Sequence, residues 1–324
     1  MSKITIEEPI VSICCTTFNH ANYIAKALEG FVRQRTSFPI EVLVHDDAST
    51  DGTAEIVQSY EQKYPSLVFP VFQSKNKYSQ GIAVNATFNI PRARGKYIAM
   101  CEGDDYWSDA NKLQWQVAYL EKTPNVAACT HEVFQNIDTN RDVRSVRRKV
   151  GVLLRHFQLY GLSSVTALLT SYWKDKTPIE CFDLTHRLKR RKGNGAIYSL
   201  EDFADGTTHM ATCSIVIRAS VVNKFLEVFH RVPHGGHQSL LLMSALSGGI
   251  AHFYSASAVK NNQLTSITED QDVRRANRAK NLDVRRNGKI LRYRYFADYA
   301  APMERKLLFK LISDEMRRIK QEKK

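Results

Sequence analysis

Three short apolar runs in the first hundred residues each end in a cluster of polar residues. Ile10–Cys15 leads into TTFNH, Ile40–Val44 into HDDASTDGT, and Tyr97–Cys101 into EGDDYW. Apolar residues at helical spacing follow the first two runs, over residues 21–32 and 54–64. Strands that alternate with helices of about a dozen residues are typical of βαβ units and a parallel sheet. We therefore expect an α/β fold whose three polar clusters meet at one edge of the sheet.

The segment after the acidic cluster predicts a helix. Leu113, Val117 and Leu120 form an apolar stripe at helical spacing, and Ser108 or Asp109 stands where an N-cap is expected. Similar patterns predict three further elements: a strand over residues 67–72, a helix over 81–93 and a strand over 126–134.

Glu102, Asp104 and Asp105 would then lie at the carboxyl end of a strand. In an open α/β sheet, ligands bind in the crevice at that end. Neighbouring carboxylates repel one another unless a cation is present, and hard divalent ions such as Mg²⁺ and Mn²⁺ take oxygen ligands and bridge phosphates. The other interpretation is a strand-to-helix turn in which the acids favour the positive end of the helix.

The composition is that of a globular protein. With 324 residues, 43% of them hydrophobic and 24% charged, the chain can form one large domain with appendages or two domains. No run reaches the roughly 18 apolar residues that span a bilayer, and residues 1–10 lack a signal-peptide pattern, so we expect a cytoplasmic protein. The cysteines are scattered without a CxxC pair, which favours buried free thiols: Cys14, Cys15, Cys101, Cys129, Cys181 and Cys213.

The net charge of +13 is concentrated at the end of the chain. Residues 271–324 hold 17 Lys and Arg against 7 Asp and Glu. Leu307, Leu308, Leu311 and Ile312 give this tail an apolar helical face among basic residues. A basic amphipathic helix is typical of contact with an anionic membrane surface, and the alternative is a helix packed on the main domain with a solvated basic side. No nucleic-acid-binding motif accompanies the charge, so we expect no nucleic-acid partner.

Four motifs in one order carry a family resemblance. They are VSICCTTFN, VHDDASTDGT, SKNKYSQGIAVNA and ARGKYIAMCEGDDYWSDANKLQWQ. Over about residues 10–135 they resemble the nucleotide-sugar-binding half of the family 2 glycosyltransferases. The resemblance implies a GT-A (Rossmann-like) fold, a mostly parallel central sheet flanked by helices, here with a basic helical C-terminal extension. The expected divisions are a donor-side half over 1–140, a basic variable insert over 141–196, an acceptor-side half over 197–270 and the tail over 271–324.

The resemblance also implies roles for single residues. Phe18 would stack on a uracil-type base, Asp47 would accept a hydrogen bond from a ring N–H, and Asp105 would bind the metal that bridges the diphosphate. Glu102 takes the first place of the family's Asp-x-Asp pattern. The full set implied to hold the nucleotide is Thr16, Phe18, Asn19, Asp47, Asn76, Asn85 and Asp104. The alternatives are a core aromatic for Phe18 and a helix-capping turn for Asp46 and Asp47.

The resemblance returns over residues 199–218 and 236–242, where many relatives carry a catalytic Asp that deprotonates the acceptor. Here His237 takes that place. A neutral imidazole can serve as the base, since its ordinary pKa of about 6.5 lies near working pH. The alternatives are that Asp202 or Asp205 is the base, that His237 is a polar surface residue, or that transfer activity is lost.

The family's later Tyr-Arg-x-His segment is also altered, with Lys260, Asn261 and Gln263 in its place. Lys260 still offers a positive charge to a phosphate, but the contact that closes on the diphosphate in relatives is changed. This departure adds to the case for a degenerate protein that binds a donor without transfer.

The sequence as a whole predicts a hexosyltransferase-type enzyme that depends on Mn²⁺ or Mg²⁺. It would move a sugar from a nucleoside diphosphate, with UDP expected, to a hydroxyl of a cell-surface glycan or lipid-linked glycan, as in polysaccharide, lipopolysaccharide or capsule biosynthesis. Inversion is implied by family analogy, and the basic tail would hold the enzyme at the inner face of the membrane. The rivals are the degenerate donor-binding protein, a basic nucleic-acid-binding protein, and a nucleotidyltransferase. A nucleotidyltransferase is disfavoured because TTFNHANY has no glycine or basic residue to cradle a triphosphate.

Overall fold

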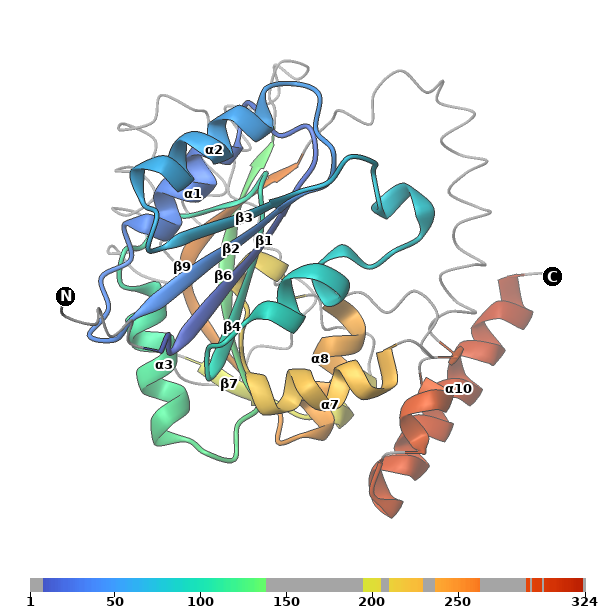
Figure 1. The fold of residues 1–324 in the computed structure, drawn as a ribbon. Coiled ribbons are helices and arrows are strands. Elements are labelled where there is room, and N and C mark those ends of the chain that lie inside the picture. The colour runs from blue at the N-terminus through green and yellow to red at the C-terminus, as the bar shows by residue number, and fades with distance from the viewer. Residues whose placement is uncertain are drawn as a thin grey trace, which may run out of the picture.

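The computed structural model describes residues 8–137, 195–204, 210–229, 237–262, 290–291, 293–298 and 300–322. A mixed sheet crosses this part of the chain, with helices on both of its faces (Figure 1). The strands are β1 (Val11–Thr17), β2 (Ile40–Asp46), β3 (Val68–Phe72), β4 (Tyr97–Glu102), β5 (Tyr106–Trp107), β6 (Ala128–Ile137), β7 (Gly195–Tyr198), β8 (Val216–Arg218) and β9 (Ile250–Asn262). The helices are α1 (Ile24–Val32), α2 (Thr53–Lys63), α3 (Lys112–Lys122), α6 (Leu200–Ala204), α7 (Ala219–Phe229), α8 (His237–Leu246) and α10 (Pro302–Glu322).

The sheet has the strand order β3-β2-β1-β4-β8-β6-β9-β5, with β7 on β9. β1 pairs in parallel with both β2 and β4, and β2 pairs in parallel with β3. β8 then runs antiparallel between β4 and β6. The predicted α/β class and the parallel arrangement of the first strands are confirmed, and the second half of the sheet mixes the two directions.

Alternation along the central strands builds a separate core on each face of the sheet. Ile13 and Cys15 of β1 face the core that α1, α2 and α3 cover, whereas Cys14 faces the core that α7, α8 and α10 cover. The described cysteines are all buried and free, as predicted, and Cys181 lies outside the described residues. Because helices cover both faces of the sheet in the described part of the chain, the ends of its strands are where a ligand is expected to bind.

The expected regular helix over residues 81–93 is wrong. The segment instead forms a π-helical turn over Asn85–Asn89 and a 3₁₀ turn over Ile90–Arg92. Pro91 has no amide to donate. The Asn89 side-chain amide donates to the Cys15 carbonyl at 2.9 Å, and the Arg92 guanidinium donates to the Val44 carbonyl at 3.0 Å. These side chains hold the segment against the sheet in place of a regular α-helical ladder.

Helix α3 begins later than its predicted cap. It starts at Lys112, and neither Ser108 nor Asp109 caps it, because an Asp109 carboxylate oxygen accepts the Asn111 amide (2.8 Å) in the turn ahead. Its predicted stripe, Leu113, Val117 and Leu120, is buried as expected.

The C-terminal helix α10 packs on the main domain. Leu308 and Leu311 are buried in the same core as α7 and α8, and Leu307 and Ile312 pack against it. Of the two expectations for this apolar face, packing on the domain is therefore the one observed. In the part of the chain that the structure describes, no helix is long and apolar enough to cross a membrane.

Candidate functional site

The ends of β1, β2 and β4 meet at one edge of the sheet, as the sequence predicts. In the parallel ladders Thr17 pairs with Asp46, and Thr16 pairs with Glu102. The bonding continues past the strands, because the Asp47 amide donates to the Thr17 carbonyl at 2.9 Å and the Gly103 amide donates to the Thr16 carbonyl at 2.8 Å. The three polar clusters are therefore fixed side by side through the backbone.

Gly103 permits the acidic loop to lie this close to β1. A Cβ at residue 103 would stand 2.7 Å from both Cβ and Oγ1 of Thr17, a distance that real Cβ contacts do not reach. The glycine between Glu102 and Asp104 is therefore required by the close approach of the backbone to a neighbouring side chain.

The acidic loop forms a compact group of charges. Asp105 is buried, with 2% of its surface exposed, and its Oδ1 accepts the Asn261 amide at 2.8 Å. Burial raises the pKa of Asp105 well above its ordinary value, and the charges of Glu102 and Asp104 raise it further. Burial likewise raises the pKa of Glu102, while the Lys260 ammonium opposes the shift at both carboxyls. This is a site where negative charge is costly unless a cation shares it.

The donor set of this loop suits a divalent ion that a diphosphate helps to bind. Among the described residues, no group of three or more His, Cys, Asp or Glu side chains is placed to hold a metal alone. Mg²⁺, however, is usually bound by one or two carboxylates together with substrate phosphates and water. Oε2 of Glu102 is buried without a hydrogen-bond partner, and an oxygen of this kind fits such an ion.

Asp47 fixes the loop that follows β3. Its two carboxylate oxygens accept the amides of Lys77 and Tyr78, at 2.8 and 2.9 Å. Only 3% of its surface is exposed, and Nε2 of His45 lies 3.5 Å from its Oδ1. Burial lowers the pKa of His45, so this imidazole is neutral near neutral pH. Asp47 therefore lies at the predicted edge of the sheet, where its observed contacts are with the backbone of the loop after β3.

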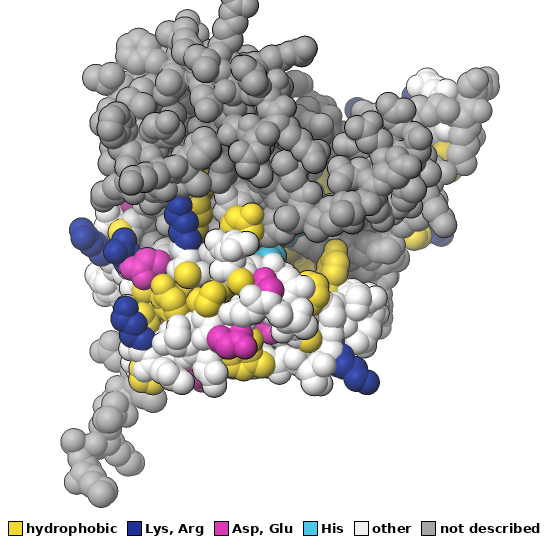
Figure 2. All heavy atoms as spheres, turned by 90° about the horizontal axis from the view of Figure 1, so that it is seen from above, with side chains coloured by type: hydrophobic (Ala, Val, Ile, Leu, Met, Phe, Trp, Pro, Cys, Tyr) yellow, Lys and Arg dark blue, Asp and Glu magenta, His cyan; other side chains and the backbone are white. Residues whose placement is uncertain are grey.

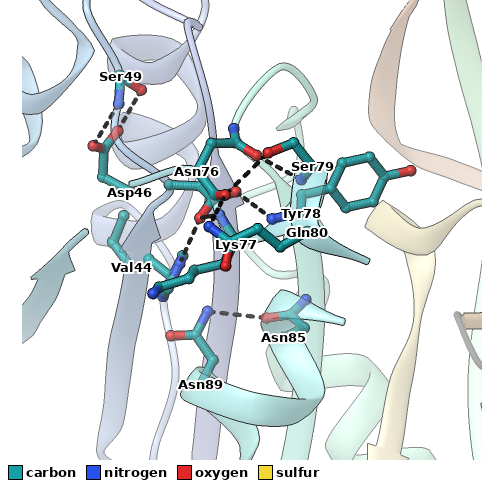
Figure 3. A network of polar contacts seen from close by, with 12 residues as sticks. Val44, Asp46, Ser49, Asn76, Lys77, Tyr78, Ser79, Gln80, Asn85 and Asn89 are labelled. Atoms are coloured by element: carbon teal, nitrogen blue, oxygen red, sulfur yellow. Dashed lines mark hydrogen bonds and ion pairs between the residues drawn. The ribbon is translucent and has the colours of Figure 1, made fainter. Parts of the chain in front are cut away.

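Asp46 and Asn19 organise the loop after β2. Asp46 accepts the Ser49 amide at 3.0 Å and the Ser49 hydroxyl at 2.5 Å (Figure 3). It shapes the turn after β2 but does not cap a helix, because α2 begins at Thr53 with Gly52 as its N-cap. Asn19, with φ of 53°, accepts the Thr50 amide through its side chain at 2.9 Å. These contacts tie the loop after β1 to the loop after β2.

Phe18 is exposed at this edge. The residue has 41% of its surface accessible, so the interpretation as a core aromatic is wrong. Figure 2 looks onto the molecule from above the view of Figure 1, and in its described part acidic side chains lie among exposed hydrophobic ones. An exposed aromatic beside buried carboxylates suits a ligand with a planar ring and a charged end.

Asn76 and Asn85 both have partners within the chain. Oδ1 of Asn76 accepts the Ser79 amide at 2.7 Å and shapes the turn that carries Tyr78, whose ring points away from this network (Figure 3). Oδ1 of Asn85 accepts the side-chain amide of Asn89 at 2.9 Å. Both residues therefore stabilise their own segments, the turn before Tyr78 and the π-helical turn.

The residues considered for the base lie in the second half of the chain. His237 is the first residue of α8, and its Nε2 lies 3.0 Å from Nε2 of Gln238. Asp202 accepts the Ser199 amide at 2.8 Å in the first turn of α6. Asp205 and Gln263 lie outside the described residues.

A buried polar group behind the acidic loop was not predicted. Lys112 is fully buried, its Nζ donates to Oε1 of Gln116 at 2.7 Å, and it stands 4.1 Å from the centre of the Trp107 ring. Burial lowers the pKa of Lys112 to about 8. Trp107 in turn donates to the Cys213 carbonyl at 2.8 Å and joins the two halves of the sheet. The sequence signal for this buried pair is a Lys and a Gln four residues apart, next to the apolar stripe of the same helix.

Solved structures with the same architecture define the class. The chain resembles S. aureus TarS 1-349 with a TM-score of 0.57 and 13% identity, over 93% of this chain and 70% of that one. The complex of that protein with UDP gives a TM-score of 0.54 at 13% identity, over 94% of this chain and 70% of that one. At this identity the likeness concerns the fold, which is that of a GT-A-type glycosyltransferase.

The family follows from the sequence match. The model of glycosyl transferase family 2 matches residues 12–188, more than half of the chain, so the chain belongs to this family. The match runs beyond the expected limit near residue 135 and covers most of the predicted insert over 141–196, of which the structure describes only residues 195 and 196.

Relatives share mainly the donor-side part. An uncharacterized protein of Mycobacterium bovis is 46% identical over 125 residues, which is 38% of this chain and 35% of that protein. A second relative is TuaG of Bacillus subtilis, which is named as a proposed teichuronic acid biosynthesis glycosyltransferase. It is 33% identical over 114 residues, which is 35% of this chain and 42% of that protein. The matched segments thus span less than half the length of these relatives.

Proposed function

We propose that this chain transfers a hexose-type sugar from a UDP-linked donor to a hydroxyl of an acceptor glycan. The observation that carries the proposal is the convergence, at one edge of the sheet, of the exposed Phe18 ring with the carboxylates of Asp47 and Asp105. An aromatic surface suits a base, and an acidic group that needs a cation suits a diphosphate. Membership of glycosyl transferase family 2 and structural similarity to a UDP complex support the same assignment.

The proposed reaction is a single displacement with inversion. The acceptor oxygen forms a bond to the anomeric carbon as the bond from that carbon to the diphosphate oxygen breaks. The electron pair leaves with the diphosphate, and the acceptor proton passes to the base, for which we propose His237 at the start of α8. A neutral imidazole would not repel the leaving diphosphate as a carboxylate would.

Asp105 is the proposed ligand of Mn²⁺ or Mg²⁺, which when bound acts as a Lewis acid on the diphosphate oxygens. The protein orients Asp105 through the Asn261 amide and keeps the carboxylate largely away from water. Thr16, Asn19 and Asp104 line the same edge, where we place the ribose and base.

The acceptor is proposed to be a cell-surface glycan or its lipid-linked precursor. The name of TuaG, a relative in the donor-side part, points to such a polymer. The outer side of α10 exposes Lys306, Lys310 and Arg317 together with Phe309 and Met316. A basic surface that includes apolar side chains suits peripheral contact with an anionic membrane, which we propose at the cytoplasmic face.

Thermal stabilisation by a panel of nucleotides and nucleotide sugars, with and without Mn²⁺, tests this function. A ligand that binds only the folded state adds about 2.7 kcal/mol of stability at a hundredfold excess over Kd. We expect a UDP-sugar to raise the Tm in a metal-dependent way, and Asp105→Asn to remove the metal-dependent part while keeping the acceptor for the Asn261 amide. Lack of stabilisation by any nucleotide in the wild-type chain would contradict the proposal.

A further inference from the structure

Strand β9 brings a lysine to the acidic loop. In the antiparallel ladder between β5 and β9, Trp107 pairs with Ala258 and Tyr106 pairs with Val259. Extending this register by one residue sets Asp105 opposite Lys260. Residues directly opposite in an antiparallel pair have Cβ atoms about 4.5–5.5 Å apart. The bond from the Asn261 amide to Oδ1 of Asp105, 2.8 Å long, fixes β9 against the loop at this point.

The charges around Lys260 are the carboxylates of the acidic loop. The ammonium interacts electrostatically with Asp105, Glu102 and Asp104, and these charges raise the pKa of Lys260 although burial alone would lower it. In the opposite direction, Lys260 lowers the pKa of both Asp105 and Glu102. The lysine and the acids therefore stabilise one another's charged forms.

We propose that Lys260 is a built-in counter-cation of the acidic loop, which competes with the divalent ion for Asp105 and sets the metal dependence of donor binding. The inference rests on the proposed function and goes beyond it, because it assigns part of the charge balance to the protein itself. In the ligand-free chain the ammonium offsets part of the negative charge of the acidic loop. When an ion and a diphosphate are bound, the ammonium turns to the phosphate oxygens.

Two measurable consequences follow from this competition. Loss of the Lys260 charge should strengthen binding of a divalent ion alone, because the ion no longer displaces an ammonium. The same loss should weaken binding of UDP in the absence of metal, since Lys260 then supplies positive charge for the diphosphate at the acidic loop. If Lys260 had only a structural role, its substitution would not strengthen Mn²⁺ binding while weakening UDP binding.

The test measures two affinities in the full chain. The affinity for Mn²⁺ alone is obtained from the electron paramagnetic resonance signal of the free ion. The affinity for UDP in the presence of EDTA is obtained by calorimetry. Lys260→Met keeps the length of the stem and removes the charge, and Lys260→Arg keeps the charge. Lys96→Met is the matched control, since Lys96 pairs with Glu121 at 2.7 Å next to the opposite end of β4. We expect Lys260→Met to bind Mn²⁺ about tenfold more tightly and metal-free UDP about tenfold more weakly. Lys260→Arg and Lys96→Met should stay within about twofold of the wild type.

The outcomes separate this inference from the proposed function. If the wild type binds UDP with Mn²⁺ but Lys260→Met matches Lys96→Met in both affinities, the role of Lys260 is wrong and the donor site stands. If the wild type binds UDP only when metal is present, the inference is also overturned, and this result needs no variant. If the wild type binds no nucleotide under any condition, the proposed function fails as well.

Discussion

The two halves of the sheet contribute to the site in different ways. β1, β2 and β4 are parallel neighbours, so the direction of the chain alone carries their loops to one edge. β9 belongs to the second half, and its antiparallel pairing with β5 brings Asn261 to the acidic loop. Asn261 lies 156 residues after Asp105 in the chain. The first half therefore supplies a set of local loops, and the second half supplies single residues whose place depends on strand register.

The largest expected effect tests whether the second half carries catalysis. We expect His237→Ala to lower kcat by 10²–10⁴-fold with UDP affinity unchanged, because general-base catalysis contributes this much. Asp202→Ala is the control, since its carboxylate bonds Ser199 within the turn at α6, and kcat should change less than threefold. Steady-state transfer kinetics measure both. If kcat of His237→Ala falls by less than about tenfold, His237 is not the base.

The next variant tests whether the tail belongs structurally to the second half. Leu308 is completely buried on α10, whereas the neighbouring Phe309 is 50% exposed. We expect Leu308→Ala to cost about 2–5 kcal/mol in the free energy of unfolding, the range for large-to-small changes in a core. Phe309→Ala should stay within about 0.5 kcal/mol. Chemical denaturation measures both, and equal effects would show that α10 is not part of the core.

Lys112 tests the junction between the halves through pH. Its pKa in the folded chain, about 8, lies below the ordinary 10.5, so the cost of burying its charge is fully present below pH 8. That cost disappears as pH rises to about 10.5, where the unfolded chain also loses the proton. The stability difference between Lys112→Met and the wild type should therefore shift by roughly 3 kcal/mol between pH 7.5 and 10.5, in favour of the wild type. A difference independent of pH would contradict the buried charge.

Gly103 tests the close packing of the first half. We expect Gly103→Ala to cost about 1–3 kcal/mol and to weaken UDP binding, because its Cβ would overlap Thr17 and displace the acidic loop. Gly81→Ala is the comparison, since nothing lies within 4 Å of its Cβ, although φ of 80° strains it. Thermal unfolding and UDP titration should separate the two variants. Unchanged UDP affinity in Gly103→Ala would show that the loop tolerates displacement.

The first half could be predicted from the sequence because its signals are local. Apolar runs followed by polar clusters predicted the strands and their common edge, and apolar residues at helical spacing predicted the buried stripe of α3. The regular helix over 81–93 failed because Asn89 and Arg92 bond to carbonyls of strands far away in the sequence. The contacts of Asn261 with the acidic loop depend on the register between β5 and β9, which no pattern within either strand reports.

Hydrogen–deuterium exchange with UDP and Mn²⁺ tests whether the three strand ends form one donor site. If they do, peptides covering residues 16–20, 46–51 and 102–107 will gain protection together, at the same UDP concentration, and will lose it together in Asp105→Asn. Protection confined to the basic residues 271–324, with the three strand ends unchanged, would show that they do not.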